Sequence, residues 1–166
     1  MVKIVLTASP MFLSRLIRRI THGRASHVMI QYQDPVLSGE WVIEASVGGV
    51  HILPAESRRH HVVAEFECLF DAESGLKGLR KYVGQEYDYV GLVFFGWAIL
   101  LWRAFRVKVR NPWRKLKNQF CSEITWRFFK RCNLPEEVEK KEPERASPEL
   151  IYKYMEANPS LFRQRL

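Results

Sequence analysis

The sequence predicts an α+β fold: a small antiparallel sheet packed against helices, one of which carries a cysteine at its start. Short runs of alternating apolar and polar residues, separated by glycine, proline, aspartate and serine, are typical of antiparallel strands joined by tight turns. Apolar residues at helical spacing predict helices at residues 10–20, 72–83 and 122–131. The chain has 166 residues, of which 47% are hydrophobic, so it can bury the core of one domain.

The first half of the chain supplies most of the predicted sheet. Residues 3–7 contain the apolar run Ile4-Val5-Leu6, which predicts a short buried strand. Residues 10–20 follow as an amphipathic helix, with apolar residues on one face and arginines on the other. Residues 27–33, 41–46 and 50–53 alternate in hydrophobicity and are separated by turn signals. We therefore expect these three strands to form an antiparallel meander.

The next part of the chain adds a strand and a helix. Residues 62–70 alternate again and predict a half-exposed strand, on which Glu65 and Glu67 face solvent. A helix is expected over residues 72–83, and Gly84 ends it, because glycine readily takes the left-handed conformation found after helices.

The C-terminal part contains a charged segment and a last helix. Residues 135–146 are rich in glutamate and lysine and are interpreted as a linker. Ser147 is a good N-cap, and Pro148 suits the first helical position, so a helix is expected to run to about residue 157.

The balance of charges suggests an anionic partner. The chain has 26 Lys and Arg against 18 Asp and Glu, a formal charge of +8. Residues 89–102 contain no charge but are shorter than the roughly 20 residues that a helix needs to span a bilayer. Two interpretations stay open: a buried helix followed by a solvated basic loop, or an apolar surface that touches lipid beside anionic head groups. The basic residues of the second interpretation are Arg103, Arg106, Lys108 and Arg110.

The cysteines indicate a reducing compartment. There are three of them, with no CxxC pair, so we expect neither a disulfide framework nor a metal site, and no cofactor. Cys68 and Cys132 fit small buried hydrophobes. Pro10 interrupts the N-terminal apolar stretch and no cleavage pattern follows, so no signal peptide is predicted. The expected location is cytoplasmic, peripheral to a membrane if the lipid interpretation of residues 89–102 holds.

Cys121 is the candidate nucleophile, because it stands where a polar, basic segment becomes a helical pattern. The positive end of a helix dipole lowers the pKa of a thiol and so favours the reactive thiolate. A thiolate also needs a base with an orienting group. His27 and Glu44 lie on adjacent predicted strands, where an imidazole and a carboxylate can sit side by side. His51 is a weaker candidate for the base.

Short motifs around these residues follow one another along the chain in an order that can be compared with known families. They are Ser26-His27-Val28, Val42-Ile43-Glu44-Ala45, Gly84-x-x-Tyr87-Asp88, Phe120-Cys121-Ser122-Glu123 and Ser147-Pro148-x-x-Leu150. In this order, over roughly residues 3 to 155, the chain resembles the circularly permuted papain-like hydrolases of the NlpC/P60 superfamily, and most closely their YiiX/YebB-like subgroup.

The resemblance implies one permuted papain-like domain over residues 1–166, with an elaboration at about 89–117. It implies Cys121 as nucleophile, His27 as general base and Glu44 as the group that orients His27. The backbone N–H of Cys121 would contribute to an oxyanion hole. Tyr87 and Asp88 match a family landmark without an assigned role.

The function implied is that of a thiol hydrolase, as amidase, peptidase or esterase, or of an acyltransferase. Its substrate would be an amide, ester or thioester of a peptide or lipid, since a related lecithin:retinol acyltransferase-like branch acts on lipid acyl chains. The alternative is a non-catalytic basic protein on the same fold that binds a membrane or a nucleic acid. Nucleic acid is disfavoured, because no recognition motif is present and the apolar segment suits it poorly. The sequence does not indicate an oligomeric state.

Overall fold

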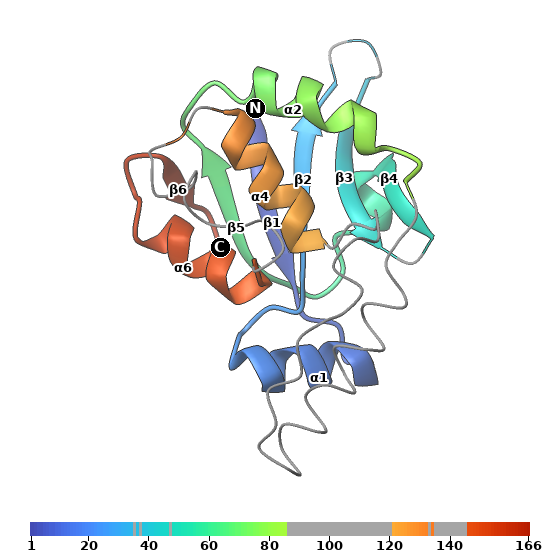
Figure 1. Cartoon of the computed structure of the whole chain (residues 1–166), viewed down its shortest axis with the longest axis vertical. Coiled ribbons are helices and arrows are strands. Elements are labelled where there is room, and N and C mark those ends of the chain that lie inside the picture. Colours follow the sequence, from blue (N-terminus) through green and yellow to red (C-terminus); the bar gives the residue numbers. More distant parts are fainter. Residues whose placement is uncertain (35, 37, 47, 86–120, 133, 135–145) are drawn as a thin grey trace, which may run out of the picture.

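The computed structural model describes residues 1–34, 36, 38–46, 48–85, 121–132, 134 and 146–166. These residues form a six-stranded sheet in the order β4-β3-β2-β1-β5-β6, in which all neighbouring strands are antiparallel (Figure 1). The predicted α+β class and the meander β2-β3-β4 are confirmed, whereas strand β6 was not expected. The strands are β1 (Val2–Thr7), β2 (His27–Gln33), β3 (Glu40–Ser46), β4 (Gly49–Pro54), β5 (Val62–Cys68) and β6 (Phe162–Gln164).

The helices follow the predicted starts and stops. Ser147 caps the last helix, since its hydroxyl accepts a hydrogen bond from the Leu150 backbone N–H, and Pro148 takes the first position. Gly84 has φ +82° just after the second helical region, as expected of a residue that ends a helix. The helices are α1 (Phe12–Thr21), α2 (Glu73–Leu79), α4 (Cys121–Arg131) and α6 (Pro148–Glu156), with short 3-10 helices η1 (Ala55–Ser57) and η2 (Arg80–Tyr82).

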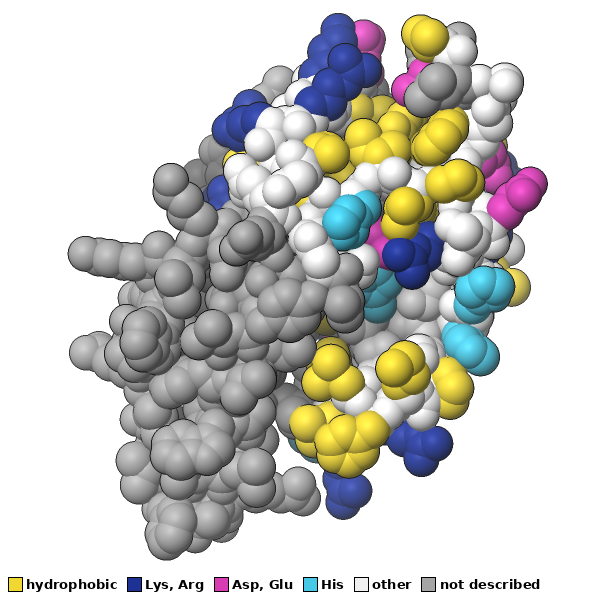
Figure 2. Space-filling model, turned by 90° about the vertical axis from the view of Figure 1, so that its right-hand side faces the viewer, with side chains coloured by type: hydrophobic (Ala, Val, Ile, Leu, Met, Phe, Trp, Pro, Cys, Tyr) yellow, Lys and Arg dark blue, Asp and Glu magenta, His cyan; other side chains and the backbone are white. Residues whose placement is uncertain are grey.

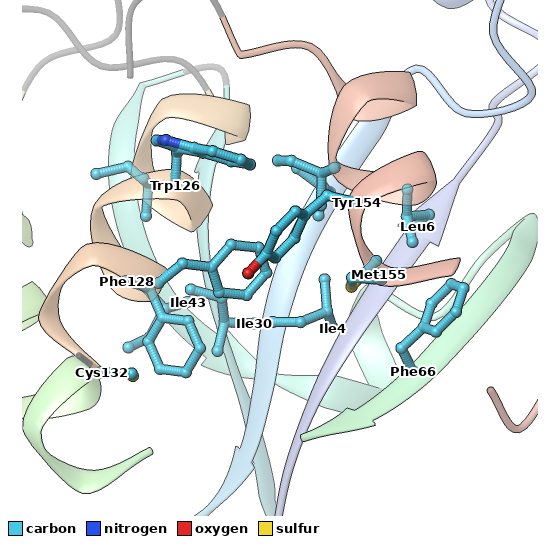
Figure 3. Packing of buried hydrophobic residues seen from close by; sticks show 14 of the residues in the cluster. Ile4, Leu6, Ile30, Ile43, Phe66, Trp126, Phe128, Cys132, Tyr154 and Met155 are labelled. Carbon is cyan, nitrogen blue, oxygen red and sulfur yellow. The ribbon is translucent and has the colours of Figure 1, made fainter. Parts of the chain in front are cut away.

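The main core lies between one face of the sheet and helices α4 and α6 (Figure 1). Ile4 and Ile30 of the sheet, Trp126 of α4 and Met155 of α6 are completely or almost completely buried and point into this layer (Figure 3). The Trp126 ring meets the Tyr154 ring edge to face, with centroids 5.4 Å apart. Burial of each large side chain stabilises the fold by about 1.5–3 kcal/mol. Helix α4, and with it Cys121, is therefore fixed against the central strands.

The opposite face of the sheet carries a smaller apolar cluster. Val5, Met29 and Val42 are buried there with Ala55 of η1, so the central strands are covered on both faces. The expectation that Glu65 faces solvent is wrong: it is 6% exposed and accepts an ion pair from Lys3, with Nζ and Oε1 3.0 Å apart. A buried carboxylate needs such a partner, and β1 beside β5 supplies it.

Helix α1 joins β1 to β2 and lies beyond the end of the sheet (Figure 1). Because α1 brings the chain back to the sheet, β2 runs antiparallel to β1 with His27 opposite Thr7. The apolar residues at the start of α1 are exposed, Phe12 to 80%, so this part of the amphipathic helix does not pack on the sheet.

Several predicted features lie outside the described residues: the apolar segment 89–102, the basic residues after it, the elaboration at about 89–117, Tyr87 with Asp88, and nearly all of the linker. In the part of the chain that is described, no helix has the length and apolar character needed to cross a membrane.

Candidate active site

The three predicted site residues come from three elements that meet at one end of the sheet. His27 is the first residue of β2, Glu44 lies in β3, and Cys121 is the first residue of α4. Strands β2 and β3 pair with Ile30 opposite Ile43, a register that brings the start of β2 beside the end of β3. Because α4 packs on these strands, its first turn lies against the start of β2.

His27 and Glu44 form the hydrogen bond that the strand pairing predicted. The distance between His27 Nε2 and Glu44 Oε2 is 2.9 Å. The side chain of Glu44 is only 3% exposed, and its second oxygen, Oε1, lies 3.2 Å from Arg58 Nε. Burial raises the pKa of Glu44, but the hydrogen bond and charge of His27, with the charge of Arg58, lower it below its usual value. Glu44 is therefore a buried carboxylate held between two cationic groups.

The imidazole of His27 also interacts with Cys121. Since Nε2 is bonded to Glu44, Nδ1 is the ring nitrogen left for the thiol. Burial lowers the pKa of His27, but the charge and hydrogen bond of Cys121, and then those of Glu44, outweigh it and raise the pKa to about 10. The three residues that the sequence singled out are thus together in one chain of contacts, Cys121 to His27 to Glu44.

The environment of Cys121 favours its thiolate. Burial raises the pKa of Cys121, but the His27 charge, a hydrogen bond from His27, and backbone N–H groups of Val28 and Ser122 lower it below the usual value. The helix start was the predicted cause, and the structure adds the imidazole and the Val28 N–H from β2. Cys121 and His27 are both partly exposed, so a small reagent can reach the pair.

The remaining cysteines differ from Cys121. Burial raises the pKa of Cys68 far above its usual value, and burial also raises the pKa of Cys132, to about 11. Both pack against the main core, as predicted, and both favour the neutral thiol at neutral pH.

The other histidines take no part in these contacts. His51 is opposite Glu44 in the β3–β4 ladder, but the hydrogen bond to the Glu44 carboxylate comes from His27. His22 ends α1 at the capping position, in the left-handed conformation with φ 50°. His60 and His61 are exposed.

Arg58 is the site residue that sequence reasoning missed. It stands beside Arg59 in a run of basic residues, and both arginines are exposed, yet each reaches a buried carboxylate, Arg58 that of Glu44 and Arg59 that of Glu65. The one feature of the sequence that could have indicated the Arg58–Glu44 pair is the presence of two arginines shortly after a strand that neighbours the Glu44 strand.

A search for metal sites and a comparison with known proteins both bear on the site. Among the described residues, no group of three or more His, Cys, Asp or Glu side chains could hold a metal ion. Comparison with models of known protein families and with curated proteins gave no match to this chain. The resemblance to permuted papain-like hydrolases therefore stays a prediction.

Proposed function

We propose that this chain is a cysteine-dependent hydrolase or acyltransferase of permuted papain-like type, with Cys121 as nucleophile, His27 as base and Glu44 as its orienting group. The observation that carries the proposal is the buried Glu44 carboxylate, 2.9 Å from Nε2 of His27, together with the charge and hydrogen bond that link His27 to Cys121. A nucleophile, a base within hydrogen-bond reach and a third group that orients the base are the parts this chemistry requires.

The reaction would begin from the thiolate–imidazolium pair. The Cys121 sulfur attacks the carbonyl carbon of the substrate, and the carbonyl oxygen becomes an oxyanion near the first backbone N–H groups of α4. The bond to the leaving amine, alcohol or thiol then breaks, and His27 gives that group its proton. This leaves an acyl thioester on Cys121 and a neutral imidazole.

His27 then acts as a base in the second half of the reaction. It takes a proton from water or another acceptor, whose oxygen or nitrogen attacks the thioester carbonyl. The carbon–sulfur bond breaks, and the acyl product leaves with the thiolate–imidazolium pair restored. Throughout, the Glu44 carboxylate holds the ring and offsets its positive charge. No metal or cofactor is required by this sequence of steps.

The proposed substrates are amides, esters or thioesters of peptide or lipid origin. A reducing compartment such as the cytoplasm suits an enzyme that depends on a free thiolate. The rival proposal, a non-catalytic binding protein on the same fold, expects Cys121 to be sealed in apolar packing. The partial exposure of Cys121 beside His27 favours the enzyme.

Labelling of the individual cysteines tests the proposal. The wild type is treated near neutral pH with a limiting amount of iodoacetamide and with an acyl-type active-site probe, and peptide mass spectrometry locates the label. We expect label on Cys121, its loss in Cys121→Ala, and unchanged labelling in the matched controls Cys68→Ala and Cys132→Ala. Equal labelling of all three cysteines would overturn the assignment. A screen of amide, ester and thioester substrates against wild type and Cys121→Ala then identifies the bond cleaved.

A further inference from the structure

The start of helix α1 presents an apolar surface that the described parts of the chain leave exposed. Met11 is 71% exposed, Phe12 80% and Leu13 42%, although they are adjacent in the chain and all apolar. We call these three residues the α1 tip. Apolar side chains gather at the lower edge of the molecule, where α1 lies, with basic side chains beside them (Figure 2). Scattered exposed apolar residues are ordinary, but a contiguous group of large ones marks an interaction site.

The surroundings of the α1 tip are basic. Helix α1 carries Arg15, Arg18 and Arg19 and has no acidic residue along its length. Arg15 and Arg19 are exposed. The loop with the exposed His60 and His61 lies next to the entry to α1, since the Ala8 backbone N–H donates to the His61 carbonyl at 2.9 Å.

Two described acidic groups near α1 and the Cys121 site already have partners and do not neutralise this charge. Glu149 lies at the far end of α1, where it is 8% exposed and accepts a hydrogen bond from the Arg24 backbone N–H. Glu44 is buried between His27 and Arg58. The α1 tip is therefore an apolar projection with cationic groups around it.

We propose that the α1 tip docks this protein on an anionic lipid bilayer. Helices that lie at a membrane interface insert apolar side chains about 5–10 Å into it while basic residues meet the anionic head groups. A second copy of the chain is a poorer occupant, because paired α1 helices would bring their arginines together. Since α1 joins β1 to His27, docking would turn the end of the sheet that carries Cys121 toward the membrane (Figure 1). The docking does not depend on the reaction proposed for Cys121.

Vesicle flotation with the full chain tests the proposal. Vesicles of phosphatidylcholine and phosphatidylserine in equal parts are compared with vesicles of phosphatidylcholine alone, at low salt and at about 1 M NaCl, where the Debye length is only about 3 Å. We expect binding to the anionic vesicles at low salt, and much weaker binding in the other conditions. No binding to the anionic vesicles, or equal binding to both kinds, would overturn the proposal.

Matched variants assign the binding to α1. Leu13 and Leu69 are both 42% exposed, but Leu69 follows β5 at the opposite end of the sheet. We expect Phe12→Ser with Leu13→Ser to weaken binding at least tenfold, Phe12→Leu to keep it, and Leu69→Ser to leave it unchanged. Equal loss in Leu69→Ser, or no loss in the α1 variants, would refute the role of the tip.

The arginines and the catalytic proposal have separate controls. Arg15→Gln with Arg19→Gln should weaken binding about fivefold for each arginine. Lys77→Gln with Lys153→Gln removes the same charge from α2 and α6 and should have a smaller effect; equal effects would mean that only net charge matters and would overturn the α1 assignment. Cys121→Ala should bind vesicles as the wild type does, so that failure of docking and failure of the proposed reaction are distinguishable.

Discussion

Replacement of Glu44 by glutamine should weaken the thiolate of Cys121 through the imidazole that lies between them. Glu44 is 3% exposed and its Oε2 is 2.9 Å from His27 Nε2, so the carboxylate stabilises the imidazolium directly. Glutamine keeps the shape and can still accept the hydrogen bond, but it carries no charge. A hydrogen bond to a charged group contributes about 1.5–3 kcal/mol. We therefore expect the ratio of thiolate–imidazolium to thiol–imidazole to fall about ten- to a hundredfold.

This prediction can be measured before a substrate is known. The thiolate has its own ultraviolet absorbance, which is read near neutral pH as the difference between each protein and the same protein with Cys121→Ala. The rate of alkylation of Cys121 by iodoacetamide, located by peptide mass spectrometry, gives an independent value. Both should fall together in Glu44→Gln.

A matched control separates the loss of the site carboxylate from a general change of charge. Glu56 is an exposed acid of η1, close in sequence to Arg58, and Glu56→Gln should leave both measurements unchanged. Circular dichroism should show that both variants are folded. Thiolate absorbance and alkylation in Glu44→Gln equal to the wild type would refute the idea that Glu44 acts on Cys121 through His27.

Two further changes probe the site and the helix that carries it. The pKa of Cys121 is lowered chiefly by the His27 charge, so in His27→Ala alkylation should begin only as pH approaches the ordinary cysteine value of about 8.5; a pH–rate profile that matches the wild type would contradict the ion pair. A Cβ at Gly75 of α2 would stand 2.6 Å from the Phe128 ring of α4 and close to the Cys132 sulfur, so Gly75→Ala should lower the free energy of unfolding by about 1–3 kcal/mol. Urea denaturation measures this, with the exposed Lys77→Ala as control, and equal midpoints for Gly75→Ala and the wild type would show that α2 can shift away from α4.

Local pattern predicted much of the fold. Alternation and turn residues placed the β2-β3-β4 meander, and the Ser147-Pro148 pair placed the start of α6, because these signals act within a few residues of the chain. The pairing of β2 with β3 then predicted the contact between His27 and Glu44. Strand β6 was missed because its three residues have no meaningful period, and they pair with β5 only after α6 has returned the chain to the sheet.

What could not be predicted depends on long-range packing. The sequence pattern assigned Glu65 to solvent, since an acid in an alternating strand usually faces water, and it gave no sign that the exposed Arg58 would pair with Glu44. In the structure each is half of an ion pair, with a partner distant in the chain. The exposure of Phe12 is similar: helical spacing defines an apolar face but does not determine what covers it.

The contacts around Glu44 are better explained by chemistry than by stability. Removing a carboxylate from water costs several kcal/mol, and a buried ion pair is often no more stabilising than apolar residues of the same size. Glu44 nonetheless lies on the same face of β3 as Val42, which is apolar and completely buried, so an apolar residue would suit the fold at least as well. What the carboxylate adds is a fixed orientation and a higher pKa for His27. A fixed, more basic imidazole is useful only if it acts on another group. The partly exposed thiol of Cys121 is such a group, because the imidazolium stabilises its thiolate.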